Sequence, residues 1–280
     1  MIIWLASYPK SGNTWIRSLL TSYFFTSEGK FNFKTLDNIK QFSSIDHSSN
    51  KINNKNYQRV VSKNWIPAQK IINADNKIHL LKTHNALCSI NNNNFTDANN
   101  TCAAIYIVRD PRNIISSISN HYDLDTEESF KFLTNKKKII FPTNDINSTY
   151  DFNFLSDWST HYNSWKKVNI FPVKIIKYED LLKNTKKEFV SLLIFLSKFM
   201  SFDINDNKVE NSILSTNFEN LKKLEKKDGF SESIISKKNK KKIMFFNLGE
   251  GNNWKKMLDI KIAKNIETCF SKEMKELKYL

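Results

Sequence analysis

IIWLASYPKSGNTWIRSLL, residues 2–20, is the segment from which the architecture can be worked out. Residues 2–6 are rich in β-branched and aromatic side chains, which is typical of a buried strand. A turn-forming segment follows, and after it the apolar side chains of residues 15–23 recur at helical spacing. A strand, a tight loop and a helix in this order direct backbone N–H groups and the positive end of a helix dipole at whatever lies above the loop. The segment therefore predicts a binding site for an anion.

The loop carries the groups that a phosphate or a sulfate needs. Lys10 supplies a mobile positive charge, and Gly12 allows close approach of the backbone. Ser11 and Thr14 supply hydroxyl donors. The pattern differs from the nucleotide-triphosphatase loop G-x-x-x-x-G-K-[ST], because here the lysine precedes the glycine. An ordinary strand-to-helix turn is the alternative interpretation.

The composition favours anionic ligands. The 280 residues contain 43 Lys and Arg against 28 Asp and Glu, which gives a formal net charge of +15. Nucleic acid, acidic lipid surfaces, sulfated nucleotides and acidic glycans all suit such an excess, and charge alone does not choose among them. The 3 cysteines show no metal spacing, and neither a secretory signal nor a membrane span is evident, so we expect a cytoplasmic protein.

Three further short apolar runs predict the other strands of a sheet. They are residues 78–81, 103–108 and 173–177, and helical patterns separate them. Strands that alternate with helices indicate an α/β fold with a P-loop-like central parallel sheet flanked by helices on both faces. Since no linker interrupts residues 1–280, we expect a single domain, with its ligands at the carboxyl ends of the strands.

The helical patterns give further expectations. Residues 56–72 predict a helix interrupted near Pro67, and residues 91–101 predict a polar loop. Residues 136–150 are expected to form an exposed insertion. Further helices are expected over residues 154–165, 184 onward, 207–227 and 255–280.

Five places along the chain resemble the sulfotransferases that use 3′-phosphoadenosine 5′-phosphosulfate. They occur in the order that this family shows, and together they cover most of the chain. The five are YPKSGNTW at 8–15, LKTH at 81–84, IYIVRDPRNIISSISNHY at 105–122, KYEDL at 177–181, and TNF at 216–218 followed by LKK at 221–223.

The resemblance implies a donor site. No metal is expected, because the donor's leaving group is already a good one and no His, Cys or Asp cluster has metal spacing. The residues that it places around the donor are Lys10, Ser11, Gly12, Asn13, Thr14, Trp15, Arg109, Ser117, Tyr178, Thr216, Phe218 and Gly249. Arg109 and Ser117 stand at the positions of the family's 3′-phosphate motif, and a guanidinium fork suits a phosphate. Trp15 and Phe218 are placed to sandwich adenine. The product would be adenosine 3′,5′-bisphosphate.

His84 is the predicted general base. It follows a strand end and lies beside Lys82, and a neutral imidazole there can accept the acceptor's proton near pH 7. Lys10 and Lys82 are the predicted catalytic cations, which stabilise the leaving phosphate and the transferring sulfuryl group. The remaining histidines have simpler interpretations: His79 as a core residue, His121 as a helix C-cap, and His47 and His161 as residues remote from any phosphate motif.

One place departs from the family pattern. Where the family has Arg-Lys-Gly, this chain has Asn247, Leu248 and Gly249. A charged contact to the 3′-phosphate is therefore missing at position 247. The lysine run at 237–242 is a possible substitute, although such a run is more often a solvated face.

The predicted activity is in-line transfer of a sulfuryl group from the phosphosulfate donor to a hydroxyl or amine acceptor. The acceptor is expected to be a small molecule, a glycan or a lipid headgroup, with no nucleic-acid partner, and neither its identity nor the oligomeric state can be deduced. Two alternatives stay open: a small-molecule kinase with an atypical phosphate loop, which would need magnesium ligands such as Asp110 or Asp180, and a non-enzymatic polyanion-binding protein.

Overall fold

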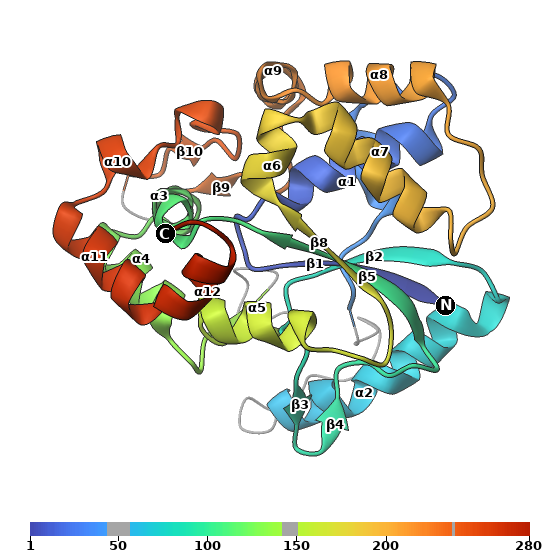
Figure 1. The fold of residues 1–280 in the computed structure, drawn as a ribbon, viewed down its shortest axis with the longest axis horizontal. Helices are drawn as coiled ribbons and strands as arrows, with labels where there is room; N and C mark the ends of the chain where they lie inside the picture. Colours follow the sequence, from blue (N-terminus) through green and yellow to red (C-terminus); the bar gives the residue numbers. More distant parts are fainter. Residues whose placement is uncertain (44–56, 142–150, 237–238) are drawn as a thin grey trace.

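Four parallel strands form the central sheet in the order β2-β1-β5-β8 (Figure 1). In this computed structural model, residues 1–43, 57–141, 151–236 and 239–280 are described. The strands are β1 (Ile2–Ser7), β2 (His79–Thr83), β5 (Thr101–Val108) and β8 (Val173–Lys177). All four apolar runs singled out in the sequence are therefore strands, as predicted. The strand order reverses between β1 and β5, and ligands bind at such a switch point in open α/β sheets.

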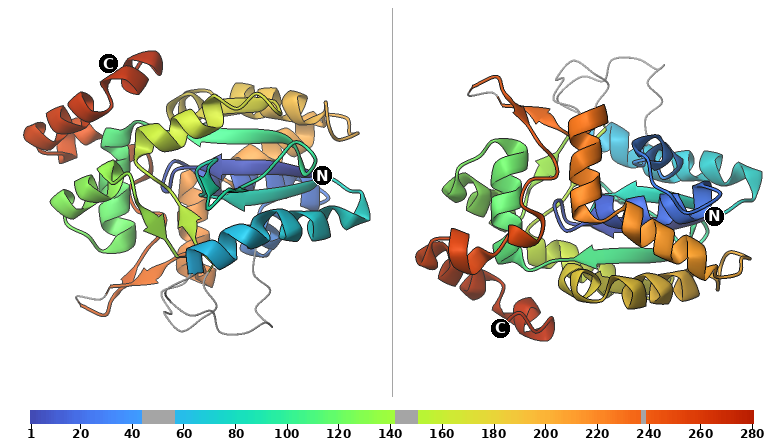
Figure 2. Two further views of the ribbon diagram at one scale, coloured as in Figure 1. Left: turned by 90° about the horizontal axis from the view of Figure 1, so that it is seen from below. Right: turned by 90° about the horizontal axis from the view of Figure 1, so that it is seen from above.

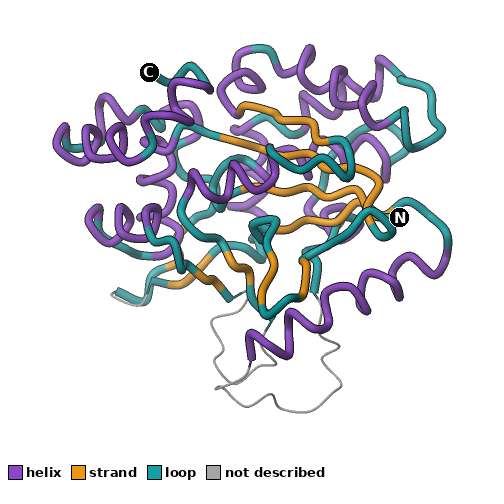
Figure 3. Tube along the Cα trace, turned by 60° about the horizontal axis from the view of Figure 1, so that its bottom comes forward, coloured by secondary structure: helices purple, strands orange, loops and turns teal. Residues whose placement is uncertain are grey.

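The two faces of the sheet bury alternate side chains of β1. Ile3 and Leu5 pack in a cluster with residues of helices α1 and α7, whereas Trp4 packs on the other face with Trp65 of α2 and Trp165 of α5. Figure 1 shows α1 and α7 on one side of the strands and α2 and α5 on the other, and Figures 2 and 3 show the helices around the sheet from further directions. The helices are α1 (Asn13–Phe25), α2 (Tyr57–Ile72), α5 (Trp158–Lys166) and α7 (Thr185–Leu196). The expected parallel sheet with helices on both faces is confirmed.

The remaining elements surround this core, and several lie beyond the carboxyl ends of the strands. The helices are η1 (Phe33–Asn38), η2 (Asn73–Asp75), α3 (Pro111–Tyr122), α4 (Thr126–Thr134), α6 (Tyr178–Lys183), α8 (Asp206–Ser215), α9 (Phe218–Asp228), η3 (Gly249–Gly251), α10 (Trp254–Met257), α11 (Ile260–Cys269) and α12 (Ser271–Glu276). Three antiparallel pairs join β3 (Ser89–Ile90) with β4 (Asn93–Asn94), β6 (Ile139–Ile140) with β7 (Asn153–Phe154), and β9 (Ile234–Ile235) with β10 (Lys242–Ile243).

The expected helix over residues 154–165 is wrong at its start. Phe154 belongs to β7, and Ser156 has a φ of 59°, which turns the chain away from a helical path. Asp157 then caps α5, because its side chain accepts from the backbone N–H of Thr160 at 2.8 Å. The spacing of Phe154 from the later aromatic residues is therefore coincidental.

Other boundaries also differ from expectation. α2 continues through Pro67, since Pro67 and Lys63 are both exposed and the carbonyl that loses its bond can be solvated. The expected helix over 207–227 is divided, because the Asn217 side chain caps a new helix, α9. The expected terminal helix is divided in the same way by Asp259, which caps α11. Residues 91–101 contain β4 and the first residue of β5, and part of the expected insertion, residues 142–150, lies outside the described residues.

Candidate active site

The loop after β1 has a backbone that only a few residue types tolerate. Gly12 has a φ of 103°, and a Cβ atom there would lie 2.6 Å from the ring of Tyr178. Lys10 has a φ of 66°, which is uncommon outside glycine and asparagine. Trp15 donates its backbone N–H to the carbonyl of Gly12, and α1 begins there. The predicted order of strand, tight loop and helix is present, with the helix N-terminus directed at the space above the loop.

Lys10 is the charged group of this loop. Its ammonium lies 3.5 Å from the centroid of the Phe245 ring and, within the described residues, its Nζ atom has no hydrogen-bond partner. Burial lowers the pKa of Lys10 to about 7, and the charges of Lys82 and Arg109 act in the same direction against that of Glu232. A buried cation without a hydrogen-bond partner is costly, so the position favours an anionic ligand.

The other loop residues divide between the cavity and the interior. The Thr14 hydroxyl donates to the carboxylate of Glu232 at 3.2 Å. Asn13 directs its side-chain N–H groups inward, to the Leu5 carbonyl at 3.1 Å and the Ser7 hydroxyl at 3.2 Å, so its amide braces the loop. The Ser11 hydroxyl and the Asn13 side-chain oxygen are both buried, and neither has a hydrogen-bond partner in the described part of the chain.

Arg109 and Ser117, which the resemblance assigns to one phosphate, meet beside this loop. Arg109 directly follows β5, in the short turn that leads to α3. Its guanidinium donates to the Lys10 carbonyl at 3.2 Å and to the Ser117 hydroxyl at 3.5 Å. Its guanidinium carbon lies 4.1 Å from the centroid of the Tyr178 ring. Nε of Arg109 is buried and has no hydrogen-bond partner among the described residues. Asp110 caps α3 and Pro111 opens it, which fixes this turn.

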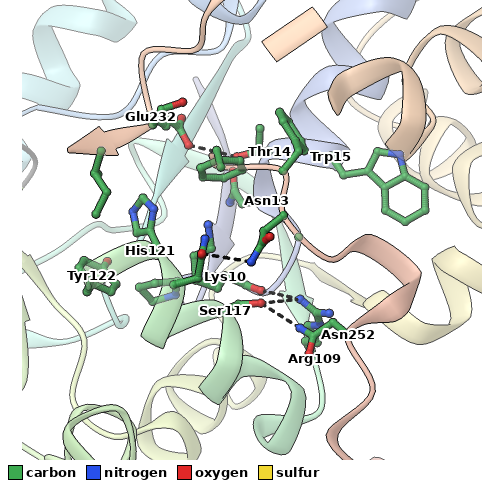
Figure 4. Close-up of a pocket in the computed structure, with 18 of the residues that line it drawn as sticks. Lys10, Asn13, Thr14, Trp15, Arg109, Ser117, His121, Tyr122, Glu232 and Asn252 are labelled. Carbon is green, nitrogen blue, oxygen red and sulfur yellow. Dashed lines mark hydrogen bonds between the residues drawn. The ribbon is translucent and has the colours of Figure 1, made fainter. Parts of the chain in front are cut away.

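Asn252 completes this cluster and was not predicted. Its side-chain N–H group donates to the Ser117 hydroxyl at 3.0 Å (Figure 4). Its side-chain oxygen accepts from the Ser116 hydroxyl at 2.6 Å. At Asn247, where the family's arginine is absent, the side chain donates to the side-chain oxygen of Asn120 at 3.1 Å. Of the lysine run at 237–242, residues 237 and 238 lie outside the described residues.

The aromatic residues predicted for adenine border the same cavity. The Trp15 ring lies 5.7 Å from that of Tyr178, edge to face. Phe218 packs over Gly249, where a Cβ atom would approach the Phe218 ring within 2.5 Å, so a side chain at this glycine would collide with the ring. Thr216 also borders the cavity, but its hydroxyl donates to the Ser212 carbonyl at 2.7 Å.

The His84 ring is oriented by a hydrogen bond between its Nδ1 atom and the backbone of β1. Its Nδ1 atom lies 2.8 Å from the Ser7 carbonyl, an acceptor, so Nδ1 carries the proton and Nε2 is left as the basic nitrogen. Two further bonds fix its backbone: Asn153 accepts from the His84 N–H at 3.1 Å, and His161 donates to the His84 carbonyl at 3.1 Å. Burial and then the Lys82 charge lower the pKa of His84 well below its ordinary value, which keeps the ring neutral at pH 7.

The other histidines partly contradict their predicted interpretations. His161 is completely buried and also accepts from the Tyr106 hydroxyl at 2.8 Å, so it supports the His84 backbone and is not remote from the site. His121 borders the cavity, and burial followed by the Lys10 charge lowers its pKa to about 3, so it is a wall residue and not a simple cap. His79 is partly exposed and paired with Asp75, and His47 lies outside the described residues.

Lys82 points at the same space and is engaged by an acidic side chain. Its ammonium lies 3.1 Å from a carboxylate oxygen of Glu232, which also contacts Arg17 at 2.8 Å. Burial lowers the pKa of Lys82, against the opposing effect of Glu232. Neither Arg17 nor Glu232 was predicted. They lie 215 residues apart in the chain, so no local motif joins them.

One cavity of about 1020 Å³ unites the site. Every residue predicted for catalysis or donor binding borders it except Ser11, which is buried behind the loop. Part of the cavity wall is apolar, and its members are Tyr122, Leu124, Phe132, Ile140, Phe141 and Phe245 together with Lys138. Among the described residues, no group of three His, Cys, Asp or Glu is arranged to hold a metal ion, and no helix is long and apolar enough to cross a membrane.

Comparisons with known proteins agree with this geometry. A family model described as "Sulfotransferase domain" matches residues 2–278. An amine sulfotransferase of Oryctolagus cuniculus is 21% identical over 279 residues, which is 98% of this chain and 81% of that protein. The crystal structure of retinol dehydratase with androsterone and the inactive cofactor PAP superimposes with a TM-score of 0.61 at 16% identity, over 98% of this chain and 80% of that one. The crystal structure of mouse sulfotransferase SULT7A1 complexed with PAP superimposes with a TM-score of 0.59 at 19% identity. The match covers 98% of this chain and 84% of that one.

Proposed function

This chain belongs to the sulfotransferase family, and on that premise we propose that it moves a sulfuryl group from 3′-phosphoadenosine 5′-phosphosulfate to a hydroxyl or amine acceptor. One observation carries the proposal. Lys10 and Arg109 each bury a nitrogen that has no hydrogen-bond partner within the described residues, and both border one cavity with the basic nitrogen of His84. Two anion-binding cations beside a neutral base are what such a transfer requires.

The residues of the cavity suit the adenosine bisphosphate part of the donor. The loop at Lys10 and the N-terminus of α1 would hold the 5′-phosphosulfate. Arg109 and Ser117 would hold the 3′-phosphate, and Trp15 and Phe218 would hold the adenine. The close contacts at Gly12 and Gly249 support this assignment, because both glycines let aromatic rings approach the backbone around the cavity.

The proposed reaction is an in-line displacement at sulfur. The donor supplies a sulfuryl group on a phosphate that leaves readily. His84 accepts the acceptor's proton at Nε2 as the acceptor forms its bond to sulfur and the bond between sulfur and the phosphate oxygen breaks. Lys82 faces the transferring group, and Lys10 stabilises the negative charge that accumulates on the leaving phosphate. Nδ1 of His84 keeps its proton, because the Ser7 carbonyl holds it.

The composition of the cavity wall supports one class of acceptor over the others. Asn153 binds the His84 backbone, and its strand partner Ile140 extends the apolar wall from there. Tyr122 and Phe132 contact each other with ring centroids 4.9 Å apart on the same wall. Such a surface favours an acceptor with an apolar or aromatic body over a glycan or a lipid headgroup. A screen of phenols, hydrophobic alcohols and amines with labelled donor would identify it.

The kinase alternative is weakened by the state of Asp110. Both of its carboxylate oxygens are engaged by the Arg112 side chain, Oδ1 at 3.0 Å and Oδ2 at 2.7 Å. A magnesium ligand would have to break this buried ion pair. Independence from metal, and a cytoplasmic location, remain predictions.

Arg109→Ala should weaken binding of adenosine 3′,5′-bisphosphate while leaving adenosine 5′-monophosphate nearly unaffected. The lost charge-assisted contact to the 3′-phosphate is worth roughly 1.5–3 kcal/mol. Calorimetry with both nucleotides measures the effect, and Arg59→Ala, at an exposed arginine of α2, is the matched control. Equal weakening of both ligands would show that Arg109 does not read the 3′-phosphate.

Affinity for the bisphosphate should fall as pH rises from about 7 to about 9. The pKa of Lys10 lies near 7 in the unliganded protein, so above it the ammonium must take up a proton before it can hold the phosphate. The loss should be roughly ten- to fiftyfold, and calorimetry in buffers of different ionisation enthalpy should detect the proton uptake. Lys10→Arg should flatten the profile, since arginine does not titrate in this range. A flat profile for the wild-type protein would refute a titrating Lys10 at the phosphate.

A further inference from the structure

Glu232 lies inside the proposed reaction site. It follows α9, on the segment that leads into β9, and its side chain is 26% exposed. One carboxylate oxygen accepts from Lys82 at 3.1 Å and from Arg17 at 2.8 Å, and the other accepts from the Thr14 hydroxyl at 3.2 Å. Figure 4 shows Glu232 on the Thr14 side of the cavity.

The groups around this carboxylate are those assigned to sulfuryl transfer. Thr14 belongs to the anion-binding loop, and Lys82 faces the transferring group. Glu232 also acts electrostatically on Lys10 and His84. Burial alone would raise the pKa of Glu232, but the charges and hydrogen bonds of Lys82 and Arg17 outweigh it and hold the pKa well below its ordinary value. The side chain is therefore a full anion at neutral pH.

We propose that the Glu232 carboxylate occupies the position that the donor's sulfuryl group takes, so that Glu232 selects against the sulfonated donor relative to its desulfonated product. This inference rests on the proposed function. A carboxylate and a sulfuryl group both present anionic oxygens to hydrogen-bond donors, and two anions cannot share Lys82 and Thr14. Adenosine 3′,5′-bisphosphate has no sulfuryl group and therefore leaves Glu232 in place.

Under this proposal Arg17 also contacts the donor's sulfuryl group. Arg17 belongs to α1, and its buried guanidinium donates to Glu232 at 2.8 Å and to the Leu36 carbonyl of η1 at 3.3 Å. Its Nε atom is buried with no hydrogen-bond partner in the described part of the chain. When Glu232 leaves, the Arg17 N–H group that it occupied faces the sulfuryl oxygens together with Lys82. Arg17 is thus a further sulfuryl-binding residue under this proposal.

The test compares two nucleotides in the absence of an acceptor. Glu232→Gln and Glu232→Ala should raise the affinity for the phosphosulfate donor, relative to that for adenosine 3′,5′-bisphosphate, by roughly tenfold or more over the wild-type ratio. The ratio is compared because the loss of Glu232 also lowers the pKa of Lys10, which affects both nucleotides alike. Glu127→Gln removes one exposed carboxylate on α4 and is the charge-matched control. It should change neither affinity.

A second variant isolates Arg17. Adding Arg17→Gln to Glu232→Gln should remove the gain in affinity for the donor and leave binding of the bisphosphate unchanged. If the Glu232 variants bind both nucleotides with equally changed affinity, or bind the donor more weakly relative to the bisphosphate, Glu232 does not occupy the sulfuryl position. If the double variant keeps the full gain, Arg17 does not contact the group. Should the wild-type protein bind neither nucleotide, the proposed function itself fails, which is a different result.

Discussion

His84→Ala should lose turnover by roughly 10²–10⁴-fold while its affinity for adenosine 3′,5′-bisphosphate stays nearly normal. The reason is geometric. The Ser7 carbonyl holds the Nδ1 proton at 2.8 Å, and this leaves Nε2 as a base at the cavity. The side chain makes no contact that the nucleotide product would need, so removing it should affect the proton transfer and not donor binding. Transfer assays with labelled donor, run beside calorimetry, separate the two.

The matched control for this experiment lies on the same strand. His79 begins β2, at the end far from the cavity, and is paired with Asp75 at 2.8 Å. His79→Ala should keep wild-type turnover. Wild-type turnover of His84→Ala at every pH would place the base elsewhere. The low pKa of His84 further predicts that the activity of the wild-type enzyme persists below pH 6, because the ring stays neutral there.

Lys10→Ala should lower both donor binding and turnover. Its ammonium is buried without a hydrogen-bond partner among the described residues, so a phosphate would gain a charge-assisted bond that alanine cannot supply. We expect roughly 10–100-fold weaker binding of the bisphosphate, and a larger loss of turnover because the leaving phosphate gains charge in the transition state.

The control for Lys10 is Lys63→Ala, which removes an exposed charge on α2 and should change neither quantity. Calorimetry and a transfer assay on the same preparations give both numbers. If Lys10→Ala loses turnover but binds the bisphosphate normally, Lys10 serves only the transition state. If neither changes, the loop after β1 does not hold the donor.

The position of the site could be predicted because its main residues follow strand ends. Lys10, His84 and Arg109 each come just after an apolar run, and in a parallel sheet these runs end at one edge. The strand order then brings the loops after β1 and β5 to the switch point. Local sequence patterns were therefore enough to predict the position of the candidate site, because the geometry of a parallel sheet brings these loops together.

The residues that sequence reasoning missed are brought in by long-range packing. Glu232 reaches Arg17 across 215 residues, and Asn252 reaches Ser117 across 135. Neither lies in a periodic pattern, so only the folded chain shows the contact. His161 was placed far from any phosphate motif for the same reason, although it bonds to the His84 carbonyl. By contrast, the start of α5 could have been predicted from the sequence, since Asp157 is a favourable N-cap residue.

The central claim, that this cavity binds the sulfuryl donor's nucleotide, is tested most directly by melting temperature with three ligands. At a concentration of about 100 times its dissociation constant, adenosine 3′,5′-bisphosphate should raise the melting temperature by roughly 5 °C without added metal. ATP with magnesium and a polyanion such as heparin should each raise it much less. Stabilisation by ATP with magnesium but not by the bisphosphate, or by the polyanion alone, would contradict the account.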